Sequence, residues 1–302
     1  MKAVTVPEYG GPEVLRVAEV PTPHPGPGEV RVQVYAAGVQ PADLAIRSGW
    51  TPPGATVVLP AVLGNEFAGV VDQLGAGTFG WETGDEVIGF GLLGGHAEYV
   101  TVDGSHLVAK PAGMPWEQAG SLSASGQTAH VALSELKVGA GDTVLVHGAA
   151  GGVGTVAVQL ARAWGATVIG TASERNHDYL RELGAVPVTY GPGLVDRVRA
   201  LAPQGVDAAL DAAGRGALDA SVELVADRDR IGTITDYRAA QRLGVRSLRG
   251  PRTAARLAEL TELWEAGGLR LEIAETFPLG RAADAHRLVA GGHVRGKVVL
   301  TP

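Results

Sequence analysis

The glycine-rich stretch "VLVHGAAGGVG" at residues 144–154 has the residue types and spacing of a loop that holds a phosphate group. The dinucleotide-binding fingerprint is G-x-G-x-x-G, and its three glycine positions are Ala149, Gly151 and Gly154 here. The second glycine lets the backbone approach a pyrophosphate, and the third lets a helix pack closely on a strand. Alanine in the first place costs little if the backbone there needs no positive φ. A plain strand–turn–helix connection is the alternative interpretation.

The backbone groups around the start of the following helix are the predicted contacts of a pyrophosphate. Unpaired N–H groups and the helix dipole favour an anion at a helix N-terminus. The predicted contact residues are Ala150, Gly151, Gly152 and Val153. The sequence therefore points to a bound dinucleotide.

The end of the next expected strand, "TVIGTASERN" at 167–176, indicates which dinucleotide. A site that prefers NAD usually has an acidic residue there, which binds the ribose diol. Ser173 and Arg175 suit the 2′-phosphate of NADPH instead, because a guanidinium forks onto phosphate oxygens. Glu174 fits either exposure to solvent or tolerance of NADH. A solvated Arg175 is the alternative to the phosphate contact.

The sequence predicts two regions that position these residues, a β domain and a region of alternating strands and helices. Short runs rich in Val, Ile, Phe and Tyr, bounded by Gly, Pro and Asp, predict a Greek-key or barrel-like β domain in the first third. These runs lie at 29–39, 64–75, 85–90 and 96–102. A helical pattern at 116–133 follows, and from residue 142 strands and helices alternate. Such alternation predicts an α/β chain with a doubly wound parallel sheet.

Composition excludes several classes of function. The 302-residue chain has a formal net charge of −7, and nucleic-acid binding needs a basic face. It has no cysteine, so disulfides, thiolate zinc sites and cysteine nucleophiles are absent. No run has the pattern of a signal peptide or the roughly 18 apolar residues of a membrane helix. We expect a soluble cytoplasmic protein with no nucleic-acid or membrane partner.

Several motifs together resemble the zinc-independent medium-chain dehydrogenase/reductases, in the quinone oxidoreductase (zeta-crystallin-like) branch. They are "AAGVQPADLAIRSG" (36–49), "GNEFAGVV" (64–71), "AAGGVG" (149–154) and "HVRGKVVL" (293–300). The resemblance implies a GroES-like β domain at 1–118, completed by 256–302, and a Rossmann NADP-binding domain at 119–255. It also implies an active-site cleft between the two domains and a homodimer, for which "RIGTITDY" (230–237) is a candidate sheet edge.

The resemblance also bears on whether catalysis uses a zinc ion. Zinc-dependent relatives have a cysteine and a histidine where this chain has Gln40 and Asn65, and amides are poor zinc ligands. No H-x₃-H or H-E-x-x-H spacing occurs in the sequence. We expect catalysis without a metal. For Asn65 and Glu66, hydrogen bonding at a strand end is at least as good an interpretation as a chemical role.

The remaining candidate site residues also follow from the resemblance. It implies that Gln40 and Asp43 face the substrate, and that the Thr128 hydroxyl approaches the nicotinamide. A helix threonine that bonds its own preceding turn is the alternative for Thr128. Further implied cofactor contacts are Tyr190, at the 2′-phosphate; Gly232, Thr233 and Ile234, at the nicotinamide ribose; and Lys297, in the C-terminal tail.

Some residues depart from the pattern of similar proteins. Gln40 stands where relatives usually have Asn, and Ala45 where bacterial quinone reductases often have Tyr, which puts quinone itself in doubt. Trp50 is a candidate aromatic wall, with simple packing as the alternative. His96 is a candidate proton donor or a structural histidine. Pocket shape is expected to depend on loops 45–60 and 236–255.

These observations predict an NADPH-dependent, metal-free reductase of a quinone or an α,β-unsaturated carbonyl. Hydride transfer needs positioning and electrostatics more than side-chain chemistry. Two alternatives stay open. One is an enoyl-thioester or enone double-bond reductase of a biosynthetic pathway, and the other is a non-catalytic NADPH-binding protein.

Overall fold

The computed structural model describes residues 1–52, 54 and 56–302, which form two compact units. The β unit comprises Met1–Ala124, Arg252–Glu262 and Glu272–Pro302, and the parallel-sheet unit comprises Ser125–Pro251 and Leu263–Leu271. The chain therefore changes unit within two helices, α3 (Ser123–Glu135) and α9 (Ala254–Glu265). Within the described residues, no helix is long and apolar enough to cross a membrane.

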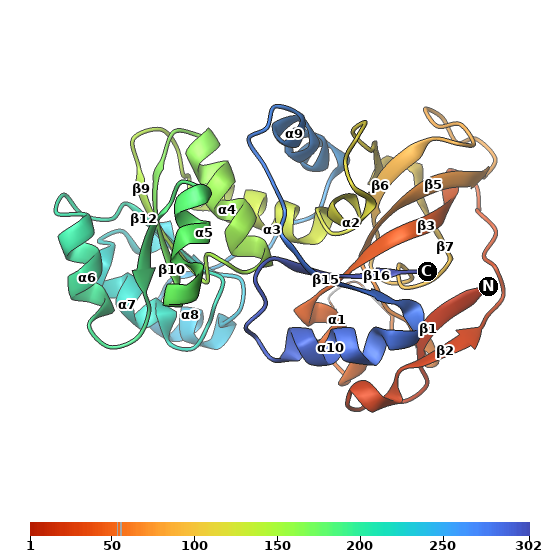
Figure 1. Cartoon of the computed structure of the whole chain (residues 1–302), viewed down its shortest axis with the longest axis horizontal. Helices are drawn as coiled ribbons and strands as arrows, with labels where there is room; N and C mark the ends of the chain where they lie inside the picture. Colours follow the sequence, from red (N-terminus) through yellow and green to blue (C-terminus); the bar gives the residue numbers. More distant parts are fainter. Residues whose placement is uncertain (53, 55) are drawn as a thin grey trace. The chain divides into compact units, whose positions relative to one another are not determined.

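The β unit is built on the long strand β3 (Glu29–Val39), in which burial alternates along 29–35 and all of 36–39 are buried. One side of β3 pairs with β5, and the other side pairs with β7 along 29–33 and with β16 along 37–39. The C-terminal strand thus completes the sheet of the N-terminal segment, and β15 pairs in parallel beyond it (Figure 1). A separate three-stranded sheet has the order β2-β1-β4. The strands and helices are β1 (Lys2–Val6), β2 (Arg16–Glu19), β4 (Ala61–Val62), β5 (Glu66–Leu74), β6 (Glu86–Phe90), β7 (Tyr99–Asp103), β8 (Leu107–Ala109), β15 (Ile273–Pro278), β16 (Lys297–Thr301), α1 (Pro41–Arg47), α2 (Trp116–Ala119) and α10 (Ala282–Ala290).

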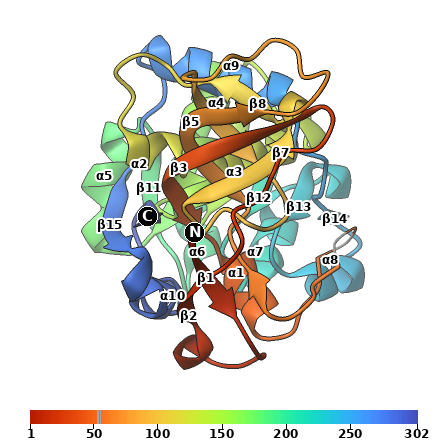
Figure 2. The same ribbon diagram turned by 90° about the vertical axis from the view of Figure 1, so that its right-hand side faces the viewer.

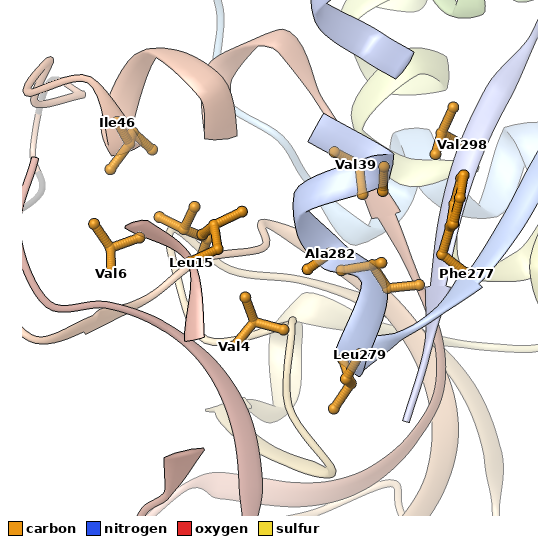
Figure 3. Close-up of a cluster of buried hydrophobic side chains, with 12 residues drawn as sticks. Val4, Val6, Leu15, Val39, Ile46, Phe277, Leu279, Ala282 and Val298 are labelled. Carbon is orange, nitrogen blue, oxygen red and sulfur yellow. The ribbon is translucent and has the colours of Figure 1, made fainter. Parts of the chain in front are cut away.

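An apolar cluster fixes helix α1 within the β unit. Figure 3 shows side chains from β1, β3, α1, α10 and the last two strands pointing toward one another. Ile46 of α1 is 2% exposed, and Phe277 of β15 is 3% exposed beside Val298 of β16. Removing this apolar surface from water favours the arrangement, and α1 carries the candidate residue Asp43.

The second unit is a six-stranded parallel sheet with the order β11-β10-β9-β12-β13-β14. In the numbering of this sheet alone, the order is 3-2-1-4-5-6, which is that of the dinucleotide-binding doubly wound fold. The predicted doubly wound parallel sheet is confirmed. Its strands and helices are β9 (Thr143–His147), β10 (Thr167–Ala172), β11 (Val186–Thr189), β12 (Ala208–Asp211), β13 (Ile231–Thr233), β14 (Arg246–Ser247), α4 (Gly152–Ala163), α5 (His177–Glu182), α6 (Leu194–Leu201), α7 (Ala217–Leu224) and α8 (Tyr237–Leu243).

Some local expectations need correction. The expected helix at 116–133 is two helices, α2 and α3. The segment 230–237 is not a sheet edge, because β14 pairs with β13 beyond it. The expected loop 236–255 contains α8 and β14 (Figure 2). The expected loop 45–60 begins within α1, and its residues Pro53 and Ala55 lie outside the described residues.

Candidate functional site

The glycine-rich loop connects β9, the strand between β10 and β12 in the parallel sheet, to helix α4. Gly148 has φ +71°, whereas Ala149 is not among the residues with positive φ. The residue that makes the tight turn is therefore Gly148, directly before the first position of the dinucleotide-binding fingerprint, which is Ala149. A Cβ on Gly154 would lie 2.6 Å from Ala149 Cα and would also contact Gly148 O. The third glycine therefore permits the close approach of helix and strand, and alanine is tolerated in the first place.

The start of α4 presents backbone donors. Gly151 is the N-cap of α4, with φ −78° and ψ 175°, and its own N–H donates to Gly148 O at 3.0 Å. The first-turn amides of a helix have no acceptor within the helix, and here they belong to Gly152 and Val153, which are partly exposed. Ala150 is buried, so only its backbone is placed to take part. The loop fits a pyrophosphate group.

The predicted 2′-phosphate residues follow two paired strands. Ala172 of β10 is in register with Thr189 of β11, and Ser173 and Tyr190 are the next residues of the two strands. Tyr190 is 53% exposed, and Arg175 is also exposed. The strand register therefore brings Ser173 and Tyr190 to the same edge of the sheet.

The end of β13 is organised by a residue that sequence reasoning missed, Asp211 at the end of β12. Its fully buried carboxylate accepts hydrogen bonds from Thr233 Oγ1 at 2.8 Å and from the amide of Gly214 at 2.7 Å. Thr233 Oγ1 also accepts from the Thr235 amide at 3.0 Å, so this hydroxyl is bound internally. Gly232 is buried and Ile234 is partly exposed. The sequence signal that could have identified Asp211 is an aspartate at the end of a buried apolar strand.

In the β unit, a buried ion pair lies between the starts of two strands. Glu66, at the start of β5, is 0% exposed, and Lys297, at the start of β16, is 3% exposed. Lys297 Nζ lies 3.0 Å from Glu66 Oε1, which also accepts from Gln40 Nε2. Glu66 Oε2 accepts from the amide of Ala124, at the start of α3, at 2.5 Å. Two predicted site residues, Gln40 and Lys297, are thus both bonded to Glu66.

Asp43 is held by backbone donors. Its carboxylate is fully buried and accepts from the amides of Gln40 at 2.7 Å and Gly64 at 3.2 Å. Burial raises the pKa of Asp43, while the charge of His96 and the two backbone hydrogen bonds oppose this rise. The carboxylate caps the first turn of α1 and ties it to the segment before β5.

The donor set around Glu66 does not fit a zinc ion. A lysine ammonium and the nitrogen of an amide occupy the Oε1 oxygen, and neither ligates zinc. Asn65 offers only an amide, whose Oδ1 is buried and accepts no hydrogen bond from another residue in the described part of the chain. Among the described residues, no group of three or more His, Cys, Asp or Glu side chains is arranged to hold a metal.

The β unit also contains two buried histidines, His96 and His286. His96 Nε2 is 3.1 Å from Gly38 O, so it donates to that carbonyl. His286 Nδ1 is 3.0 Å from Arg47 Nη1, so it accepts from the guanidinium. The rings of His96 and His286 meet edge to face with centroids 6.4 Å apart. Both side chains are fully buried, which favours a structural role for His96.

Acid should destabilise the protein through His286. Burial lowers the pKa of this imidazole from 6.5 to about 3, with the charges of His96 and Arg47 acting in the same direction. The unfolded chain then binds more protons, so stability is lost as the pH falls below the unfolded pKa. At 1.36 kcal/mol per pKa unit, the loss between pH 6.5 and pH 4.5 is about 2 kcal/mol. Glutamine at 286 can still accept from Arg47 but does not titrate. We therefore expect the unfolding free energy of H286Q, measured with urea at both pH values, to fall by about 2 kcal/mol less than that of the wild type. An equal fall in both proteins would contradict this role of His286.

The other predicted positions are dispersed. Thr128, on α3, is partly exposed, and its hydroxyl makes no hydrogen bond to another described residue. Trp50 is 45% exposed after α1.

Arg252 covers the ring of Phe90, the last residue of β6, with its guanidinium carbon 5.2 Å from the ring centroid. Arg252 donates to Asn65 O at 2.6 Å and to Gly91 O, and no local sequence signal marks it.

Comparisons with known proteins define the class. A family model described as "Alcohol dehydrogenase GroES-like domain" matches residues 26–112, and one described as "Zinc-binding dehydrogenase" matches residues 183–300. A quinone oxidoreductase from Pseudomonas aeruginosa is 33% identical over 100% of this chain and 99% of its own length. The chain belongs to the medium-chain dehydrogenase/reductase family of oxidoreductases, and quinone oxidoreductases are among its relatives.

Three further relatives bear on which cofactor the fold binds and on the biosynthetic context in which similar proteins occur. A component of the pikromycin polyketide synthase of Streptomyces venezuelae is 37% identical over 94% of this chain, which spans only 8% of that protein. A mycobacterial protein solved in complex with NADPH has a TM-score of 0.88 at 32% identity, with 100% of both chains covered. An NAD-dependent alcohol dehydrogenase of known structure has a TM-score of 0.89 at 32% identity, also with 100% of both chains covered. The fold therefore binds a pyridine nucleotide, and the choice between NADPH and NADH rests on this chain's own residues.

Proposed function

We propose that the chain is a metal-free, NADPH-dependent reductase of a quinone or an α,β-unsaturated carbonyl. The observation that carries this proposal is the start of α4, where Gly148 and Gly154 bring helix and strand together and leave first-turn amides for an anion. The proposed pyrophosphate contacts are the backbone groups of Ala150, Gly151, Gly152 and Val153. The proposed contacts at the nicotinamide end are those of Gly232, Thr233 and Ile234.

The residues of this chain would bind and position rather than react. NADPH, when bound, supplies hydride from C4 of its nicotinamide ring. Negative charge then develops on the carbonyl oxygen of the substrate, where hydrogen-bond donors stabilise it. The Thr128 hydroxyl is the proposed donor, since it has no hydrogen-bond partner among the described residues, and the proton that adds at carbon comes from water. For Gln40, Asp43 and Lys297 we propose positioning roles, because their polar groups are bonded within the β unit.

The 2′-phosphate of NADPH should depend on Arg175. Losing a charge-assisted hydrogen bond costs about 1.5–3 kcal/mol, which corresponds to roughly tenfold to a hundredfold in affinity. We expect Arg175→Ala to weaken NADPH binding by that factor and to leave NADH binding almost unchanged. Tyr190→Phe should act in the same direction but more weakly, since it removes a neutral hydroxyl. Titration calorimetry with both cofactors measures the ratio, and Arg199→Ala, at an exposed arginine of α6, is the control. If Arg175→Ala weakens both cofactors equally, the phosphate contact is wrong and Glu174 becomes the residue to test.

Cofactor oxidation against a panel of quinones, enones and enoyl thioesters tests the reaction. Turnover of quinones or simple enones supports the main proposal. Turnover confined to enoyl thioesters supports the second candidate, which the similarity to a polyketide synthase component favours. Tight NADPH binding with no turnover of any member of the panel would show a binding protein and overturn the proposal.

A further inference from the structure

A basic segment stands out in an acidic chain. The protein has 25 Lys and Arg against 32 Asp and Glu. Residues 236–249 nevertheless hold four arginines, Arg238, Arg242, Arg246 and Arg249, and one acidic residue. All four belong to the parallel-sheet unit, on or beside α8 and β14, which lie next to each other (Figure 2). We call residues 236–249 the arginine segment.

Its arginines differ in their partners. Arg242 lies 3.2 Å from Asp219, but both side chains are more than half exposed, and Arg246 pairs with Glu135 at the surface. Such exposed pairs are weak, but each carboxylate offsets the charge of its arginine, so the remaining positive charge of the segment comes from Arg238 and Arg249. In the described part of the chain, no carboxylate lies within ion-pair distance of Arg238 or Arg249.

Arg249 is held by an aromatic ring instead. Its guanidinium carbon lies 3.8 Å from the ring centroid of Tyr237, and the Tyr237 hydroxyl donates to Ile234 O at 2.9 Å. An arginine stacked on a ring keeps its N–H donors in the plane of the guanidinium, where they can bind a phosphate. Arg249 is therefore an exposed, pre-oriented cation.

The arginine lies beside the end of β13. The preceding residue, Leu248, donates its amide to Thr233 O at 2.9 Å. Leu248 also packs where a Cβ on Gly232 would be, with Cδ1 2.6 Å from that position. Arg249 thus follows directly after a residue fixed on the strand end that is proposed to contact the nicotinamide ribose.

The phosphates of the cofactor do not account for this charge. The proposed pyrophosphate site follows β9, and the proposed 2′-phosphate site follows β10. In the sheet order, β14 is three strands from β9 and four from β10. At about 4.8 Å per strand, these separations are roughly 14 Å and 19 Å. The arginine segment is therefore a separate cationic site beside the proposed hydride-transfer position.

We propose that the arginine segment binds a phosphate group of the substrate, and that the substrate is an α,β-unsaturated thioester carried on a phosphopantetheine-type handle. This inference rests on the proposed NADPH-dependent reductase function and selects its second candidate, an enoyl-thioester reductase, because an uncharged quinone gains nothing from guanidinium groups. In the reaction, hydride adds to the β-carbon, a proton from water adds to the α-carbon, and the C=C bond becomes a single bond as NADPH becomes NADP⁺. The phosphate belongs either to a free coenzyme A ester or to a carrier-protein ester.

The test compares crotonyl-CoA, a crotonyl ester on a carrier protein, and phosphate-free crotonyl-pantetheine. We expect Arg249→Gln to lower kcat/KM at least tenfold for a phosphate-bearing ester and to change the pantetheine ester less than twofold. The ester that is affected identifies the source of the phosphate. Arg199→Gln, on α6, is the matched control and should change none of the three. An equal effect of Arg249→Gln on all three esters, or no effect on any, would overturn the proposal.

Binding without turnover separates this inference from the proposed function. Calorimetry with coenzyme A and with the phosphopantetheinylated carrier protein should show binding to the wild type that weakens in Arg249→Gln. If neither binds, or if Arg249→Gln binds both as well as the wild type does, the phosphate site is wrong. If binding depends on Arg249 and no enoyl ester is reduced, the phosphate site stands and the proposed reductase function fails.

Discussion

Gly151→Val is expected to reduce NADPH affinity more than a hundredfold while the protein stays folded. Among the described residues, a Cβ at this position would meet only Gly148 O, at 3.4 Å, which is ordinary contact, and φ is −78°. The protein itself therefore has room for the Cβ of a side chain. The proposed pyrophosphate leaves no such room, because its binding needs a close approach of the backbone. Titration with NADPH and thermal unfolding measure the two parts of this expectation.

Two further glycine variants make this result interpretable. Gly139→Val adds the same side chain in the same unit, at a position where no atom of the described residues lies within 4 Å of the added Cβ, and it should change neither affinity nor stability. Gly154→Val should unfold the unit, because its Cβ would lie 2.6 Å from Ala149 Cα. NADPH affinity of Gly151→Val within threefold of the wild type would show that this loop does not hold the pyrophosphate.

Glu66→Gln is expected to destabilise the β unit by about 3–5 kcal/mol, the usual cost of breaking a buried ion pair. The variant removes the carboxylate charge that lies 3.0 Å from the Lys297 ammonium, and the Lys297 side chain is only 3% exposed. Replacing both residues, as Glu66→Gln with Lys297→Met, removes the buried ammonium as well and should recover part of the loss. Urea unfolding of the two single variants and the double variant gives the coupling energy.

The matched control for this pair is Glu272→Gln, also in the β unit. Glu272 accepts from Arg295 Nη2 at 2.7 Å, and the side chains of Arg295 and Glu272 are 45% and 37% exposed. An exposed pair contributes at most about 1 kcal/mol, so this variant should remain near wild-type stability. Equal losses from Glu66→Gln and Glu272→Gln, or losses that simply add in the double variant, would contradict a coupled buried pair.

The parallel-sheet unit was predictable because its signals are local. A buried strand, a glycine-rich turn and a helix follow one another within 143–163, and the third glycine has the predicted packing role. Strand–helix alternation then restricts the topology, since parallel connections are right-handed. The candidate 2′-phosphate contacts were likewise read from strand ends. The register places Ser173 and Tyr190 one residue beyond the paired ends of β10 and β11, and their contact with a phosphate stays a prediction.

The interior of the β unit was not predictable in the same way. Glu66 and Lys297 are separated by 231 positions, and Arg47 and His286 by 239, so no spacing rule connects them. Their contacts exist because β16 pairs with β3 and because α10 packs beside α1. Gln40 was expected to face a substrate, yet its amide nitrogen bonds to Glu66. The sequence marked the polar residues but not which of them bind one another.

Isotope transfer from the cofactor to a product tests the reductase proposal most directly. The protein is incubated with an enone or an enoyl thioester, a metal chelator, and NADPH carrying deuterium at C4, with each face of the ring labelled in turn. We expect one labelled face to give a product that is one mass unit heavier, with the deuterium at the β-carbon and the rate unchanged by the chelator. An unlabelled product from both faces, or activity that is lost to the chelator and restored by zinc, would contradict metal-free hydride transfer from NADPH.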